Sequence, residues 1–176
     1  MQTTLTNPYI IRSPRVAFLN LGGAEAQPLM DEDRAALGQY FATCTVSEKA
    51  VPVCDVLVLY CTIEPTGQIT GYDLTLRQII RDSRSVIVLV ASENAGERYI
   101  AAARQEGYGT ANLVMTLSRN ENSFVHFFQQ LFGKIAAGMT MPMAWVDLAP
   151  QIPGRPQGNV PETIFACEAG HVTFAT

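Results

Sequence analysis

The sequence predicts an α/β protein in which a mostly parallel sheet of about five or six strands is covered by helices on both faces, as a three-layer sandwich. The first observation behind this expectation is that short apolar runs alternate with segments of helical spacing. The second is composition, because 48% of the 176 residues are hydrophobic and only 16% are charged. Such a chain indicates strands buried on both faces or an oligomeric surface, and we expect both.

Apolar and β-branched runs predict the strands of the sheet. They cover residues 15–21, 43–46, 53–60, 85–91 and 111–116. Gly22 and Gly23 follow the first run and are expected to form a sharp turn. Near the end of the chain, residues 163–167 and 172–175 are predicted to form a hairpin around the turn at 168–171, or to supply an edge strand.

Helices are expected where apolar residues recur at helical spacing. These segments contain residues 37–41, 74–80, 97–105, 124–136 and 143–148. Asp31, Glu32 and Asp33 suit the N-terminus of the first helix, because carboxylates compensate the helix dipole there. The run of Met139, Met141, Met143 and Trp145 is expected to pack in the core, with an adaptable partner surface as the alternative.

The length of 176 residues suits a single domain that spans residues 1–176. Residues 1–14 precede the first predicted strand and are expected to form an N-terminal extension. Residues 150–161 are rich in proline, which predicts an ordered loop or short connection.

Charge and cysteine spacing argue against several classes of function. The net charge is -4 and the Lys and Arg residues are scattered, so no basic stripe favours nucleic acid. No apolar stretch approaches the roughly 18 residues of a membrane helix, and the N-terminus lacks the pattern of a signal peptide. The four cysteines show no metal-binding spacing. We therefore expect reduced thiols in a cytoplasmic protein without a metal or cofactor.

The third and fourth predicted strands each end in a short polar turn. The two turns contain Cys61-Thr62 and Ser92-Glu93-Asn94. In parallel sheets the carboxyl ends of neighbouring strands meet at one crevice, where ligands bind. We therefore expect these five residues to line a binding crevice, in which Cys61 and Ser92 are the candidate nucleophiles.

The later features of the chain follow one another in a definite order. From Asp55 onward they include the turn 92–96, a helix up to Gly107, a strand over 113–117, the Phe-rich segment 127–131, the Ala-rich segment 136–138 and the run 143–149. In this order the chain resembles the CHAT family of caspase-like cysteine peptidases. The resemblance implies a caspase-like fold.

The chain departs from the CHAT pattern at both catalytic positions. In that family one strand ends in His-Gly, and the next core strand ends in a Ser-Ala-Cys-x-x-Gly turn. The position resembling the histidine holds Cys61, followed by Thr62 in place of glycine. The position resembling the cysteine holds Ser92, or Ala91 if the turn is shifted by one residue. The resemblance therefore implies a pseudoenzyme, because a cysteine peptidase needs a thiolate and an imidazole beside it.

These replacements predict an inactive caspase-like domain that binds a protein or peptide partner, or that assembles as a homo-oligomer. The two histidines, His126 and His171, are not predicted to reach the crevice. Without a base, Cys61 would keep an ordinary thiol pKa of about 8.5, and Ser92 is expected to cap the following helix. Two alternatives stay open. One is a small cysteine or serine hydrolase using Cys61 or Ser92, and the other is a flavodoxin-like domain that binds a small ligand.

Overall fold

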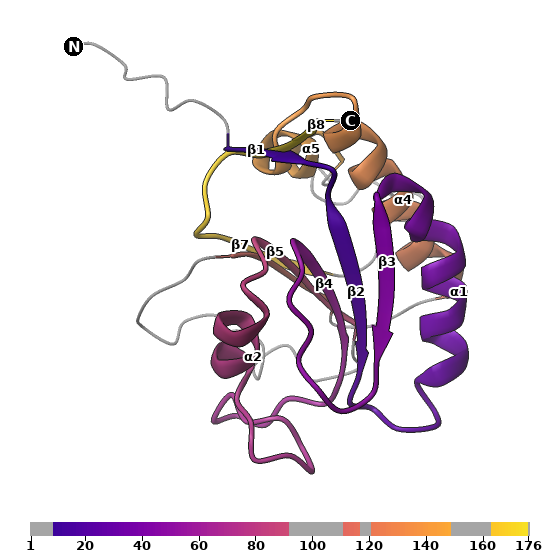
Figure 1. Ribbon diagram of the computed structural model, residues 1–176, viewed down its shortest axis with the longest axis vertical. Coiled ribbons are helices and arrows are strands. Elements are labelled where there is room, and N and C mark those ends of the chain that lie inside the picture. Colours follow the sequence, from indigo (N-terminus) through magenta and orange to yellow (C-terminus); the bar gives the residue numbers. More distant parts are fainter. Residues whose placement is uncertain (1–8, 92–110, 117–120, 149–162, 176) are drawn as a thin grey trace, which may run out of the picture.

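The computed structural model describes residues 9–91, 111–116, 121–148 and 163–175, with the backbone alone at 121–123. Its main sheet has six strands in the order β3-β2-β4-β5-β6-β7 (Figure 1). The strands are β2 (Arg15–Asn20), β3 (Thr43–Ser47), β4 (Val56–Tyr60), β5 (Ile87–Ala91), β6 (Asn112–Thr116) and β7 (Thr163–Cys167). All neighbours pair in parallel except β6 and β7. The predicted mostly parallel sheet is therefore confirmed.

Helices cover both faces of this sheet. Among the described residues, the α-helices are α1 (Gln27–Leu37), α2 (Leu76–Ser83), α4 (Glu121–Ala136) and α5 (Met141–Leu148). α1 and α4 lie on one side of the sheet and α2 lies on the other (Figure 1), while α5 packs into the same core as α1 and α4. Every residue of β4, β5 and β6 is buried. Burial on both faces explains why these strands are unbroken apolar runs.

The alternation of side chains along β2 divides the core into two halves. Val16 and Phe18 pack on the side of α1 and α4, whereas Ala17 and Leu19 pack on the side of α2. All four are buried. Because a shift of one residue would exchange the two sets, burial on both sides specifies the register of β2 strongly.

A second, two-stranded sheet corrects the predicted C-terminal hairpin. β1 (Tyr9–Arg12) pairs in parallel with β8 (Val172–Ala175), while β7 pairs with β6 at the edge of the main sheet. The edge strand expected as the alternative is present, but the pairing of the last two strands with each other is wrong. Residues 9–12 belong to this second sheet, although the sequence places them in an extension.

The side chain of Asn112 accounts for the separation of β7 from β8. Its Nδ2 donates a hydrogen bond to the carbonyl of Gly170 at 3.1 Å, and its Oδ1 accepts one from the N–H of Ala169 at 3.2 Å. Gly170 has a φ of 76°, a left-handed conformation that glycine adopts at little cost. The buried amide of Asn112 thus holds the chain where it turns away from the main sheet.

α1 begins before the acidic residues that were expected at its N-terminus. The helix starts at Gln27, with a proline in its first turn. Pro28 suits that position, because the N–H that proline lacks would have no partner within the helix. Asp31, Glu32 and Asp33 fall later in the helix, and Asp33 is fully buried. The expected place of these carboxylates is therefore wrong, since the proline determines where the helix starts.

Some expectations fall outside the residues that the structure describes. They are the helix over 97–105, the connection over 150–161 and the turn that contains Ser92, Glu93 and Asn94. These expectations stay predictions.

Candidate binding site

The order of the strands creates a switch point beside β2. The chain passes from β2 to β3 on one side, and then crosses to β4 on the other side of β2. The connections before and after this change of direction diverge, which opens a crevice outside the carboxyl ends of the strands. This is the usual ligand site of an open parallel sheet.

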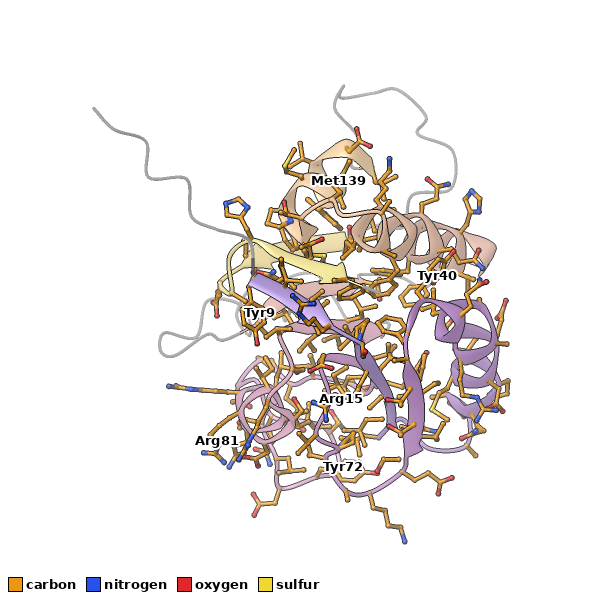
Figure 2. All side chains as sticks on the ribbon, turned by 45° about the horizontal axis from the view of Figure 1, so that its top comes forward. Tyr9, Arg15, Tyr40, Tyr72, Arg81 and Met139 are labelled. Atoms are coloured by element: carbon orange, nitrogen blue, oxygen red, sulfur yellow. The ribbon has the colours of Figure 1, made fainter. Side chains whose placement is uncertain are left out.

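A groove with a volume of about 940 Å³ lies at this switch point. It is lined by Asn20, Gly23, Ala24, Gln27, Pro28, Glu48, Lys49 and Tyr72. These residues come from the end of β2, the start of α1, the turn after β3 and the loop between β4 and α2. Figure 2 shows Tyr72 at the end of the molecule that lies opposite Met139.

Asn20, the last residue of β2, organises the turn that borders the groove. Its Oδ1 accepts a hydrogen bond from the N–H of Gly22 at 3.0 Å. Its Nδ2 donates to the carbonyl of Gly23 at 3.0 Å and to Oε1 of Gln27 at 3.2 Å. Gly23 has a φ of 74°, and a Cβ at Gly22 would lie 3.0 Å from Cβ of Ala26. Glycine therefore suits both positions: Gly23 adopts a left-handed conformation at little cost, and a side chain at Gly22 would crowd Ala26.

The walls of the groove carry several different chemical groups. Nε2 of Gln27 donates to the carboxylate of Asp31, at 3.2 and 3.3 Å from its two oxygens. Glu48 and Lys49 directly follow β3, and both are exposed. Tyr72 is half-buried. The groove thus presents an amide, an aromatic ring, a carboxylate and an ammonium group to an occupant.

Backbone and side-chain hydrogen bonds shape the loop that carries Tyr72. The N–H of Tyr72 donates to the carbonyl of Ile69 at 3.1 Å, and its carbonyl accepts from Nε2 of Gln68 at 3.2 Å. Three residues later, Thr75 caps α2. Its Oγ1 accepts from the N–H of Gln78 at 3.2 Å, and the N–H of Thr75 donates to Oε1 of Gln78 at 2.7 Å. This reciprocal capping box fixes the point where the loop ends.

A buried polar pair connects α1 to the end of β4. The hydroxyl of Tyr60, the last residue of β4, donates to Oδ2 of Asp33 at 2.5 Å. Both side chains are almost completely buried. The carbonyl of Tyr60 also accepts from the N–H of Leu21 at 2.8 Å. These bonds hold β4 against the strand and the helix that border the groove.

Cys61, the first candidate nucleophile, belongs to the core. Its side chain packs on the α2 side of the sheet and is only 4% exposed. Burial raises the pKa of its thiol to about 12, so the group is protonated at neutral pH and is a poor nucleophile. The neighbouring Thr62 is exposed, and neither residue lines the groove.

The two histidines lie away from Cys61. His126 is on α4, which covers the other face of the sheet, and its Nε2 lies 2.8 Å from Nε2 of Gln130. His171 is exposed in the turn before β8. Ser92, Glu93 and Asn94 fall outside the described residues, so their expected place in a crevice stays a prediction.

The described part of the chain holds neither a metal-binding cluster nor a membrane-spanning helix. Within it, no group of three or more His, Cys, Asp and Glu side chains could hold a metal ion. No helix there combines the length and the apolar character needed to cross a membrane.

A smaller hollow of about 360 Å³ lies on α5, and it is lined by Met139, Pro142, Met143, Val146 and Asp147. Met143 is 59% exposed, whereas Met141 is fully buried. In the methionine segment, Met141 therefore packs in the core, as expected, whereas Met143 lies on the surface.

Of the residues that line the larger groove, sequence reasoning named Gly23 only, and it named Gly23 as part of a turn and not as part of a binding site. Glu48, Lys49 and Tyr72 lie in turns without any motif. A further signal was available in Asn20, an amide that ends an apolar strand directly before the two glycines. Such an amide can satisfy the backbone of a tight turn.

Comparison of the chain with protein-family models, curated proteins and solved structures found no match. The candidate function therefore rests on the groove and its surroundings.

Proposed function

We propose that this protein is a non-catalytic binding domain of caspase-like architecture, and that the groove between β2, β3 and β4 recognises a peptide segment of a protein partner. The observation that carries this proposal is the groove of about 940 Å³ at the switch point of the sheet. The architecture is supported by a three-layer arrangement around six strands whose last strand, β7, closes one edge.

The non-catalytic part of the proposal is supported by the state of Cys61. A reactive thiol is partly exposed and is usually close to a cation or a base. Cys61 is instead buried among apolar side chains, and its pKa is raised to about 12. A protonated thiol in this position cannot attack a substrate that lies in the groove.

A peptide fits the chemistry of the groove better than a compact apolar molecule does. Pockets for small molecules are lined mainly by apolar and aromatic side chains. Here Gln27 offers an amide, and Glu48 and Lys49 offer opposite charges on one rim. Peptide amides and charged side chains would match these groups, while Tyr72 supplies an aromatic surface for an apolar anchor.

A small ligand is the second candidate, because one observation favours it. The order β3-β2-β4-β5-β6 places the first strand of the main sheet between the second and third, as in flavodoxin-like sheets that bind a small ligand at this switch point. The groove volume also lies within the range of small-molecule sites, about 300–1,000 Å³.

Peptide selection with the full-length chain tests the first candidate. A phage-displayed library of random peptides is panned on the immobilised protein, and the selected peptides are labelled for fluorescence anisotropy. We expect Tyr72→Ala to weaken binding at least about tenfold, since aromatic anchors carry much of an interface's binding energy. Met143→Ala, in the hollow on α5, is the matched control and should leave binding unchanged.

The same experiment separates the alternatives. Mass spectrometry of the bound peptides should find them intact, and cleavage products would support a hydrolase instead. Equal binding by the wild type and Tyr72→Ala would place the peptide site outside the groove. If no peptide is selected, native mass spectrometry of the purified chain tests for a small bound molecule whose retention depends on Tyr72.

A further inference from the structure

β3 forms an open edge of the main sheet. It stands at the end of the strand order and pairs with β2 alone, in an unbroken register from Arg15–Thr43 to Leu19–Ser47. Among the described residues, the backbone of 43–46 has no hydrogen-bond partner beyond this ladder. Its outer row of N–H and C=O groups is therefore available to another strand.

The side chains of β3 lack the devices that protect sheet edges. Thr43, Cys44, Thr45 and Val46 are exposed, and Ser47 is half-buried. None of the five residues is charged or a proline, and the regular register leaves no room for a bulge. Natural proteins usually protect an exposed edge with lysine, proline, a bulge or a covering segment. An unprotected edge of this kind is suited to strand pairing with a partner.

The two faces of β3 have different chemical character. Cys44 and Val46 are paired with Val16 and Phe18, so they point to the side of α1. Thr43, Thr45 and Ser47 point to the opposite side, which is the side of α2. One face of the edge is therefore apolar and the other carries only hydroxyl groups.

We propose that β3 pairs antiparallel with β3 of a second copy of this chain, about a two-fold axis, so that the two main sheets become one continuous sheet. Opposite residues in such a pair must point to the same face, so the axis passes through a residue and not between two residues. Thr45 is the middle residue, and an axis through it gives all five residues a partner.

In this register, hydroxyl side chains lie opposite hydroxyl side chains on one face, and apolar side chains lie opposite apolar side chains on the other. Thr45 lies opposite Thr45 of the second copy, Thr43 lies opposite Ser47, and Cys44 lies opposite Val46. Hydroxyl pairs and apolar pairs across strands each stabilise a sheet. The charged residues Glu48 and Lys49 follow β3 at one end only. In the antiparallel pair, Glu48 and Lys49 of one chain lie at the opposite end of the paired strands from Glu48 and Lys49 of the other chain. Like charges therefore do not face each other.

The β3–β3 interface is small, so the dimer must be measured at several protein concentrations. One strand of five residues from each copy contributes less than a standard interface, which buries about 1,600 Å². We therefore expect a dimer that dissociates on dilution. We expect the pairing to be independent of a ligand in the groove, because Tyr72 and Gln27 lie on other elements and the groove residues Glu48 and Lys49 follow β3 outside the paired strand.

Sedimentation velocity over a dilution series of the full-length chain tests the proposal. The wild type should pass from a dimer to the monomer of 19.2 kDa as it is diluted. Val46→Lys places a charge on the edge and should raise the dissociation constant at least about tenfold. Val53→Lys is the matched control, because Val53 is also exposed, at 55%, but lies outside β3. Circular dichroism verifies that both variants fold.

A wild type that is monomeric at every concentration overturns the proposal, and it would leave a segment of another protein as the occupant of this edge. A dimer that responds equally to both lysine substitutions also overturns it, because the interface would then lie elsewhere.

Cysteine cross-linking tests the register in a chain that carries Cys44→Ser and Cys167→Ser, so that both exposed thiols are removed. Thr45→Cys should form a disulfide-linked dimer, because opposite Cα atoms lie about 4.5–5.5 Å apart. Ser47→Cys is the control on the same face, and its two copies would lie about 14 Å apart. Cross-linking through Ser47→Cys and not through Thr45→Cys would overturn this pairing.

Discussion

At the scale of the residue, a buried hydrogen bond between Tyr60 and Asp33 joins two layers of the molecule. We expect Tyr60→Phe to lower the free energy of unfolding by about 1–3 kcal/mol, because the substitution removes a donor from a buried carboxylate. Urea unfolding measures this difference. Tyr9→Phe, at a tyrosine that is 59% exposed, should cost almost nothing. Equal stability of Tyr60→Phe and the wild type would mean that the bond contributes little.

Because the thiol of Cys61 is buried, we expect the protein to lose stability at alkaline pH. Burial raises the folded pKa of this thiol to about 12, well above the ordinary thiol value of about 8.5. The unfolded thiol therefore ionises first, so the stabilisation is complete below about pH 8.5 and decreases as the pH rises toward 12. The expected slope is about 1.4 kcal/mol per pH unit for this group. We therefore measure the free energy of unfolding of the wild type and of Cys61→Ala between pH 8 and pH 11. This free energy should decrease less steeply with pH in the variant. Parallel curves would contradict the raised pKa.

At the scale of the element, the capping box of α2 makes a local contribution. Thr75→Ala removes the acceptor for the N–H of Gln78, and we expect it to lower the free energy of unfolding by about 1 kcal/mol. Thr70→Ala changes an exposed threonine in the same loop and should have no measurable effect. Thermal unfolding of both variants tests the cap, and equal melting temperatures would argue against it.

Asn112 makes a longer-range contribution, because it ties β6 to the chain between β7 and β8. In Asn112→Ala, both bonds to residues 169 and 170 are lost. We expect faster amide hydrogen exchange in β1 and β8, since the sheet that they form depends on this anchor. Exchange in β4 and β5, in the centre of the main sheet, should stay slow. Uniform acceleration in all four strands would show a global loss of stability instead.

The elements that sequence reasoning located correctly are those with a local cause. β4, β5 and β6 are unbroken apolar runs, and burial of a strand on both faces produces that pattern directly. Pairing between strands has no such local cause. β7 and β8 read as a hairpin because they are close in the sequence, yet the amide of Asn112 and the partner strand β1 separate them. For α1, Pro28 was the decisive signal, and the acidic residues that follow it were misleading.

At the scale of the whole molecule, the candidate groove depends on which strands become neighbours. The sequence predicted a crevice at the ends of the third and fourth predicted strands, whereas the groove lies beside the ends of β2 and β3. It also joins turns after β2 and β3 with the loop after β4, and that combination follows from the strand order alone. No local pattern connects Asn20 with Lys49 or Tyr72, so these residues could be found only after the sheet was assembled.

The groove and the open edge of β3 are separate surfaces, and a pair of variants should separate their functions. Tyr72→Ala removes an aromatic side chain but keeps the backbone bonds to Ile69 and Gln68, so it should weaken peptide binding without changing the dissociation constant of the dimer. Val46→Lys should do the opposite, because Val46 lies on the edge and not in the groove. Effects at independent sites add, so the double variant should lose both properties by the same factors. Fluorescence anisotropy measures the peptide affinity of all four proteins, and sedimentation velocity measures the dissociation constants of their dimers. A change in peptide affinity on Val46→Lys would show that the edge and the groove are coupled through Glu48 and Lys49, which directly follow β3.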